Sequence, residues 1–114
     1  MAIQIVQPAT FSWPVKVQIP RDGGGYEAAT FDATFKRLTR SEAEEMGGKV
    51  FSGELSGVDA VRSILVGWAG VMAGDEPIPF SEMNRERLLD IPGAAVAIFG
   101  AFTDAMDGKA RAKN

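Results

Sequence analysis

Residues 11–19 read FSWPVKVQI, and apolar and polar side chains alternate along the whole segment. In an extended chain the apolar set shares one face, and it consists of Phe11, Trp13, Val15, Val17 and Ile19. This period of two predicts a half-buried strand that ends at Pro20. Pro14 falls on the polar face and has no backbone N–H, which favours an edge position or a bulge.

The residues that follow predict a hairpin. Asp22-Gly23-Gly24-Gly25 reverses the chain, because glycine readily adopts the positive φ that such a loop needs. A return strand is predicted from about Tyr26 to Leu38, with Ala29, Phe31, Ala33 and Phe35 on one face. Tyr26 is out of phase with this set, which predicts a bulge near Ala28.

A two-stranded ribbon is marginally stable in water, so the hairpin needs further partners. We expect Ile3 and Ile5 to supply a short third strand, and helices to cover the apolar face.

Four helices are predicted in the remainder of the chain. The capping box Ser41-Glu42-Ala43-Glu44 opens a short first helix that Gly47-Gly48 stops. Ser56 opens a second, whose apolar face consists of Val58, Val61, Leu65 and Trp68.

Glycines and prolines then predict a loop, with a turn at Gly74-Asp75. Ser81 caps a third helix, roughly residues 82–90. Pro92 begins a fourth that runs to about Asp107 and is closed by Gly108.

These elements predict an α+β fold, in which an N-terminal antiparallel β-hairpin or small sheet packs against three to four C-terminal helices. A chain of 114 residues normally forms one domain, which we place at residues 1–108. Residues 109–114 contain Lys109, Arg111 and Lys113 and are predicted to be a basic, disordered tail.

Charge bears on the choice of partner. The chain has 12 basic and 15 acidic side chains, and three of the basic ones fall in the tail. Residues 1–108 therefore carry nine basic and 15 acidic side chains, a formal charge of −6, which repels a phosphate backbone. No stretch reaches the roughly 20 apolar residues of a membrane span, and no secretory signal is recognisable, so we expect a cytosolic protein without nucleic-acid or membrane partners.

The residues that usually carry chemistry are missing. Without cysteine or histidine, the chain has no thiolate and no imidazole for catalysis or metal binding. The glycine-rich loop after Asp22 precedes a strand and lacks the Gly-Lys-Ser/Thr of a phosphate loop. The carboxylates Glu42, Glu44 and Glu45 are interpreted as a solvated helix face. We expect a protein that is not an enzyme and has no cofactor or metal.

The predicted last helix is apolar or small at almost every position between Ile91 and Phe102. A helix that is apolar nearly all round is either buried in a core or docked on another chain. Both interpretations stay open. The candidate protein-binding residues are Trp68, Ile98, Phe99 and Phe102.

Several blocks of sequence follow one another along the chain in a recognisable order. The first are residues 8–15, PATFSWPV, the turn Asp22-Gly23-Gly24, and residues 31–38, FDATFKRL. The later ones are Leu65-Val66-Gly67-Trp68, Pro79-Phe80-Ser81 and Leu88-Leu89-Asp90-Ile91-Pro92. In this order the blocks resemble a family of tail assembly chaperones from long-tailed, siphovirus-type bacteriophages and prophages.

The resemblance implies a phage tail assembly chaperone that binds the tape measure protein, keeps it soluble and assists polymerisation of the tail tube protein. It also implies a location in the host cytoplasm, absence from the mature virion, and a possible longer frameshifted form of the same chain. The alternative is a minor structural protein of the phage tail.

Overall fold

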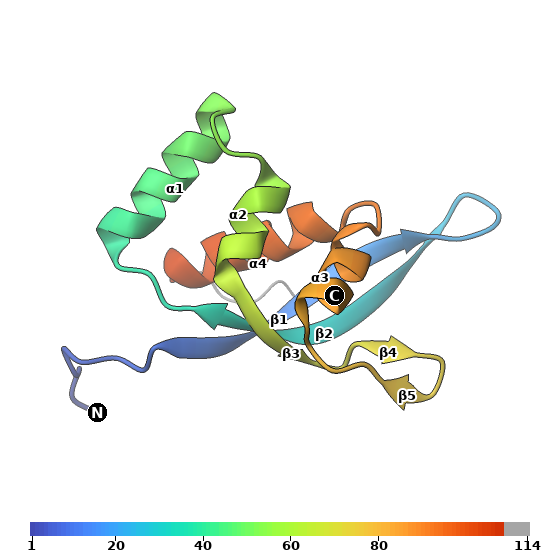
Figure 1. Cartoon of the computed structure of the whole chain (residues 1–114), viewed down its shortest axis with the longest axis horizontal. Coiled ribbons are helices and arrows are strands. Elements are labelled where there is room, and N and C mark those ends of the chain that lie inside the picture. Colours follow the sequence, from blue (N-terminus) through green and yellow to red (C-terminus); the bar gives the residue numbers. More distant parts are fainter. Residues whose placement is uncertain (109–114) are drawn as a thin grey trace.

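The computed structural model describes residues 1–108, and the predicted tail lies outside them. Strands β1 (Thr10–Pro20) and β2 (Tyr26–Lys36) form a long antiparallel hairpin, paired without interruption from Thr10–Lys36 to Pro20–Tyr26 (Figure 1). Gly23 and Gly24 provide the turn with φ of 94° and 90°. The predicted hairpin and its apolar face are confirmed, because Val15, Val17, Phe31, Ala33 and Phe35 are all buried.

The predicted bulge near Ala28 is wrong, because Ala28 pairs with Gln18 in regular register. Tyr26 is 64% exposed at the hairpin tip, where no helix covers the ribbon, so its phase has no core to match (Figure 1). The register shift lies instead between Thr34 and Phe35, where β2 meets a third strand. Pro14 lies on the edge strand β1, as the sequence predicted.

The third strand is not formed by Ile3 and Ile5, which are 91% and 98% exposed. It is β3 (Leu65–Ala69), which pairs antiparallel with β2 and completes the order β1-β2-β3. The prediction that Leu65 and Trp68 lie on a helix is therefore wrong. The open edge of β2 offers backbone partners to a segment rich in strand formers, and these outweigh the helical spacing.

Gly67 has a specific role in this strand. A Cβ at Gly67 would lie 3.2 Å from the Thr34 Cβ on the neighbouring strand, closer than most real contacts allow. Glycine therefore permits the close approach of β3 to β2.

Helix α1 (Arg40–Ser52) differs from its prediction at both ends. Its cap is Thr39, not Ser41: the Thr39 hydroxyl accepts from the Glu42 N–H at 3.2 Å, and the Glu42 carboxylate accepts from the Thr39 N–H at 2.9 Å. The helix continues through Gly47-Gly48 and ends at Gly53, which has a φ of 83°. Interior glycines weaken a helix by about 1 kcal/mol each but do not stop it.

The remaining three helices begin close to their predicted positions; the last two also end close to them, but the first ends at Ile64, before the predicted helical residues Leu65 and Trp68. They are α2 (Gly57–Ile64), α3 (Glu82–Leu89) and α4 (Ala94–Met106). The hydroxyls of Ser56 and Ser81 accept from the third residue of their helices at 3.0 Å, which confirms both predicted caps. Between β3 and α3, strands β4 (Met72–Ala73) and β5 (Glu76–Pro77) form a small hairpin around the predicted Gly74-Asp75 turn.

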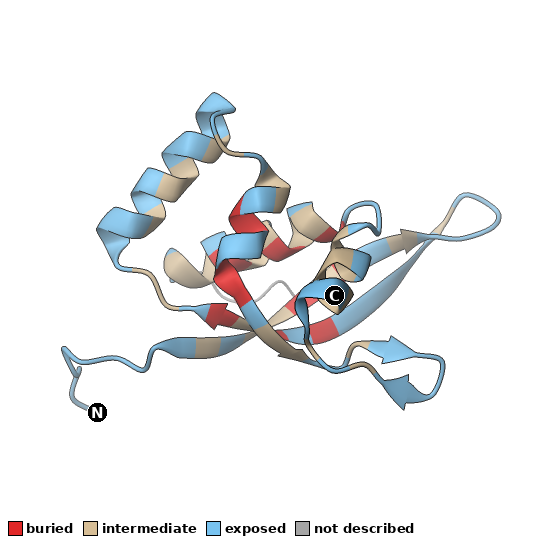
Figure 2. Cartoon of the chain, in the orientation of Figure 1, coloured by how far each residue is buried: buried red, intermediate tan, exposed pale blue. Residues whose placement is uncertain are grey.

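The core lies where α2 and α4 meet the middle of the sheet (Figure 2). The three-stranded sheet, α2 and α4 contribute small or apolar side chains to it: Val15, Val17, Phe31, Ala33, Phe35, Ala60, Val61, Ile64, Leu65, Ala94, Ile98 and Phe102. No polar or charged residue within 1–108 is buried. The fold is thus α+β, as predicted. The tip of the β1–β2 hairpin and the outer side of the helices are exposed to solvent (Figure 2).

Candidate protein-binding surface

The four residues predicted to bind a partner lie in two separate places. Ile98 and Phe102 are 0% and 3% exposed, and the Phe102 ring lies 5.3 Å from the Phe35 ring, edge to face. Phe99 is half-buried and packs against the same core. Their positions agree with the core interpretation of α4, whose outward face carries the 79% exposed Val96. A binding role for these residues stays a prediction.

Trp68 lies on β3 and contacts the segment that follows the β4–β5 hairpin. Its indole N–H donates to the Ile78 carbonyl oxygen at 2.8 Å, and its ring meets the Phe80 ring edge to face at 5.0 Å. Trp68 is half-buried by these contacts. It supports the loop of residues 70–80 and does not join the α4 residues.

Next to this loop the surface has an apolar groove that no local pattern in the sequence predicts. It consists of two hollows that share Val71, Leu88 and Ile91. The first, of about 120 Å³, lies between the distal half of the β-hairpin and the α3–α4 junction; its lining is Val17, Ile19, Ala29, Thr30, Phe31, Gly70, Val71, Leu88, Ile91 and Ala94. Thr30 is the one polar residue in this set.

The second hollow, of about 180 Å³, continues between α3 and the β4–β5 hairpin, and its lining adds Met72, Ala73, Ile78, Asn84 and Arg87. Met72 is 50% exposed and Ile91 is 40% exposed. The groove therefore offers exposed apolar side chains along its length and polar side chains, Asn84 and Arg87, in its second half.

A larger hollow of about 430 Å³ lies elsewhere, between the α4 residues Ala97, Gly100 and Ala101 and the strands. Its lining includes three charged side chains, Lys16, Asp32 and Asp104. A partner there would have to match these charges, whereas the apolar groove requires little more than apolar surface. The groove is therefore the better candidate for a helical polypeptide.

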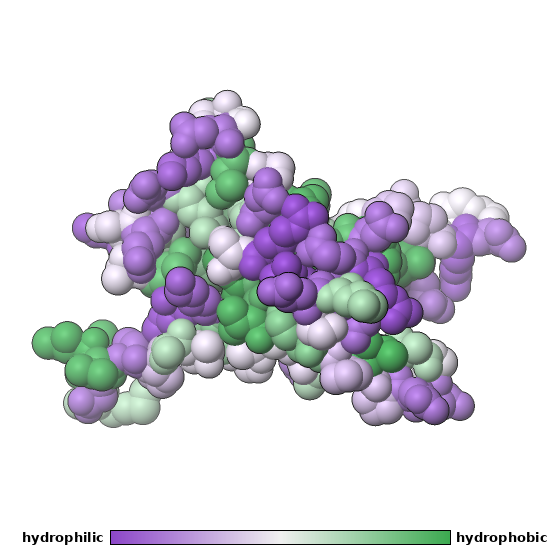
Figure 3. Space-filling model, in the orientation of Figure 1, coloured by the Kyte–Doolittle hydropathy of each residue, from purple (hydrophilic) through white to green (hydrophobic). Residues whose placement is uncertain are grey.

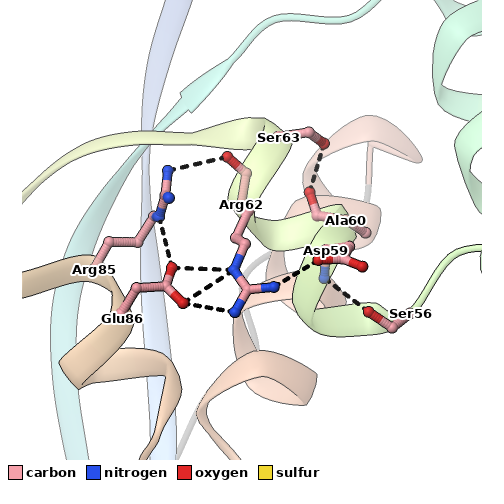
Figure 4. A network of polar contacts seen from close by, with 7 residues as sticks. All are labelled: Ser56, Asp59, Ala60, Arg62, Ser63, Arg85 and Glu86. Atoms are coloured by element: carbon pink, nitrogen blue, oxygen red, sulfur yellow. Dashed lines mark hydrogen bonds and ion pairs between the residues drawn. The ribbon is translucent and has the colours of Figure 1, made fainter. Parts of the chain in front are cut away.

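The α3 wall of the groove is held by a polar network that links α2 to α3 (Figure 4). The Arg62 Nη2 donates to the Glu86 Oε1 at 2.6 Å, and the Arg62 Nη1 donates to the Asp59 Oδ1 at 2.6 Å. The Arg85 Nε adds a bond to the Glu86 Oε2 at 3.2 Å. α3 has no buried residue, so these contacts help to hold the helix in place. They thereby help to position Leu88, and Ile91 just after the helix, in the groove.

The network also shifts the protonation of its members. Hydrogen bonds from Arg62 lower the pKa of the Glu86 carboxyl below its ordinary value. Partial desolvation raises this pKa, and the hydrogen bond and charge of Arg85 lower it further. The same bonds, which Arg62 donates to Glu86, and the bond that it donates to Asp59 raise the pKa of the Arg62 guanidinium. The side chains of Arg62 and Glu86 are each 42% exposed, so solvent screens the pair.

The groove is lined mainly by apolar side chains. Within residues 1–108 no group of three or more acidic side chains is placed to hold a metal ion. Three ends of the apolar pattern converge in the groove: Ile19 at the end of β1, Val71 after β3, and Ile91 before Pro92. These three residues lie far apart in the sequence, and the tertiary fold brings them together.

No single helix within residues 1–108 is long and apolar enough to cross a membrane; α3 and α4 pass such a test only as a pair bent by 103°. Over residues 1–114, the sequence matches the family described as phage tail assembly chaperone. The chain belongs to this family.

The family match confirms the resemblance carried by the sequence blocks, and it assigns this chaperone a part in building the phage tail. No curated protein and no solved structure matches the chain. The apolar groove is thus a candidate binding surface in a member of a tail assembly chaperone family.

Proposed function

We propose that this chaperone binds amphipathic helical segments of its phage's tape measure protein in the apolar groove and keeps that protein soluble. It thereby assists polymerisation of the tail tube protein around the tape measure. It acts in the cytoplasm of the bacterial host, leaves before the virion is complete, and catalyses no reaction.

The observation that carries the proposal is the groove itself. An amphipathic helix presents apolar side chains at positions i, i+3, i+4 and i+7, and such a stripe buries itself in an apolar cleft. Val71, Leu88 and Ile91 line both hollows, so they offer a continuous apolar surface to the apolar stripe of such a helix. Arg87 and Asn84 at one end can bond to polar side chains that flank the stripe.

The size and charge of the surface agree with reversible binding. A chaperone must release its client during assembly, and a small interface gives the modest affinity that release requires. The formal charge of −6 on residues 1–108 disfavours capture of nucleic acid and favours basic client segments.

The test is co-expression with the tape measure protein of the same phage, using two groove variants. Met72→Asp and Ile91→Asp each place a charge on a half-exposed groove residue, and each is expected to weaken client binding by about tenfold or more while the chaperone stays folded. Met83→Asp is the matched control, because Met83 is 74% exposed on α3 and outside the groove lining. Equal client binding by the wild type and all three variants would show that the groove is not the client-binding site.

Mass spectrometry of purified virions separates the chaperone role from that of a minor structural tail protein. We expect the chain to be absent from virions and present in lysates of cells that are assembling tails. A stoichiometric amount in the virion would favour the structural role. A longer frameshifted form would appear in the same lysates as peptides that extend past residue 114.

A further inference from the structure

Residues 1–7, MAIQIVQ, form a segment that projects from the sheet with its apolar side chains in solvent (Figures 1 and 3). Met1, Ile3, Ile5 and Val6 are all at least 88% exposed. The segment has no charged side chain. Among the residues that the structure describes, its one side-chain hydrogen bond runs from Gln7 to the Gln4 carbonyl oxygen, within the segment itself. We call residues 1–7 the arm.

The arm has the pattern of an unpaired strand. Ile3 and Ile5 share one face when the chain is extended, Ala2 and Gln4 share the other, and isoleucine favours strands. Within the chain the arm continues past the point where β2 stops, because Thr10 pairs with Lys36, the last residue of β2. The hydrogen-bonding groups of the arm therefore have no strand beside them.

The sheet has two edges, and they differ in how well they are guarded. The edge strand β1 contains Pro14 and Lys16, and both residue types discourage the addition of another strand. The other edge, β3, reads LVGWA and contains neither proline nor charge. Among the described residues, no backbone hydrogen bond reaches Leu65–Ala69 from the side opposite β2. No described strand pairs with β3 on this side, and the segment that carries Ile78 and Phe80 contacts the side chain of Trp68 near one end of β3.

We propose that the arm of one chain adds to the β3 edge of a second copy of this chain, as a fourth strand. The five residues of β3 match the length of residues 2–6. Backbone hydrogen bonds between the two would satisfy groups that a single chain leaves to water, and Ile3 and Ile5 would lose their exposure on one face of the extended sheet.

The geometry favours a second copy over the arm's own β3. The Arg37 N–H donates to the Ala9 carbonyl oxygen and the Arg37 Nε donates to the Pro8 carbonyl oxygen, both at 2.8 Å, and these bonds fix the direction in which the arm leaves the sheet. β3 lies two strands from β1, or roughly 10 Å away across β2. Figure 1 shows the arm directed away from the sheet. To reach its own β3 the arm would have to reverse at Pro8 and cross the end of β2.

The first experiment measures self-association by analytical ultracentrifugation over a range of protein concentrations. Ile3→Asp combined with Ile5→Asp is expected to raise the dissociation constant about 100-fold or more, because burial of one isoleucine changes a binding constant by roughly tenfold or more. Ala2→Asp combined with Gln4→Asp adds the same two charges on the other face and is expected to have a much smaller effect. All variants are exposed-site changes, and circular dichroism checks that each stays folded.

The second experiment separates the arm from the edge it binds. Val66→Lys puts a lysine on the β3 edge, at a residue that is 44% exposed. Alone, this variant and the Ile3→Asp, Ile5→Asp variant are each expected to be monomeric. Mixed, they are expected to form a 1:1 heterodimer, since one supplies an intact arm and the other an intact edge.

The chain has no cysteine, so engineered thiols report the contact directly. Gln4→Cys in one chain and Val66→Cys in another should give an interchain disulfide on oxidation. A wild-type chain that stays monomeric up to roughly 100 µM, a weak affinity for any specific contact, would overturn the proposal. So would self-association that the arm variants leave unchanged, or a Gln4→Cys, Val66→Cys double variant that links only within one chain. The proposal would also fail if the arm variants lost client binding and kept their self-association.

Discussion

Helices α1 and α4 each have 13 residues, but different forces hold them in the molecule. α4 buries Ala94, Ile98 and Phe102 against the sheet and α2, whereas α1 has no buried residue. α1 has a full capping box at Thr39 and a left-handed glycine at its end, whereas no side chain caps the start of α4. Burial stabilises one helix, and local hydrogen bonds stabilise the other.

The two helices therefore differ in how much a substitution in them should change the stability of the protein. A helix that depends on burial transmits any loss of volume to the whole core, because interiors are close-packed. A helix that depends on caps responds to its own backbone and leaves the core unchanged. Three predictions test this distinction, and the first has the largest expected effect.

Phe102→Ala should lower the free energy of unfolding by about 3–5 kcal/mol, because it removes a 3% exposed ring that contacts the rings of Phe11 and Phe35. Phe51→Ala, at a 95% exposed site on α1, should change it by less than about 0.5 kcal/mol. Urea denaturation at neutral pH measures both. Similar losses in the two variants would contradict the contrast between the helices.

Gly47→Ala combined with Gly48→Ala should stabilise the protein by about 1–2 kcal/mol, because alanine is the better helix former at interior positions. Neither glycine has a positive φ, and a Cβ at either would meet no atom within 4 Å. Thermal unfolding measures the gain, and the amide exchange rates of α1 should fall with it.

Gly93→Ala is the control for this pair, because Gly93 has a φ of 86° and an alanine there would be strained. Loss of stability in the Gly47, Gly48 variant would mean that α1 is held by contacts to the glycines themselves.

Much of the fold could be predicted from local patterns in the sequence. The alternation in β1 and β2 and the serine caps of α2 and α3 are short-range signals, and the structure confirms them. β3 could not be predicted in the same way. Its residues also fit the spacing of a helix, and the competition is decided by the open edge of β2, which lies 30 residues earlier in the chain.

The same reasoning applies to the binding surface. Ile98, Phe99 and Phe102 stand out in the sequence because they are large and apolar, but size and apolarity are also the marks of a core residue. The groove depends on residues from β1, α3 and the segment after β3 meeting in space. No local pattern contains that information.

Helix α3 provides the third test, because like α1 it has no buried residue, and an exposed ion pair joins it to α2. Hydrogen bonds from Arg62 hold the pKa of Glu86 below its ordinary value of 4.5. Since the folded pKa is the lower one, the stabilisation is fully present above about pH 4.5 and is lost as the pH falls through the folded pKa.

Wild type should therefore melt at a higher temperature than Glu86→Gln near pH 7, and this gap should narrow once the pH falls below about 4.5. Thermal melts between neutral and acidic pH measure the gap, and it should be small because the pair is exposed. Glu82→Gln is the matched control: Glu82 lies on the same helix but outside the network of Figure 4, so its gap should lack this dependence on Arg62. In a second comparison, with Arg62→Gln in the background, the Glu86 gap should become smaller, and the part that remains belongs to the bond from Arg85 to Glu86. If the Glu86 gap is as large without Arg62 as with it, then the ion pair between α2 and α3 does not stabilise the protein, and α3 must be held by other contacts.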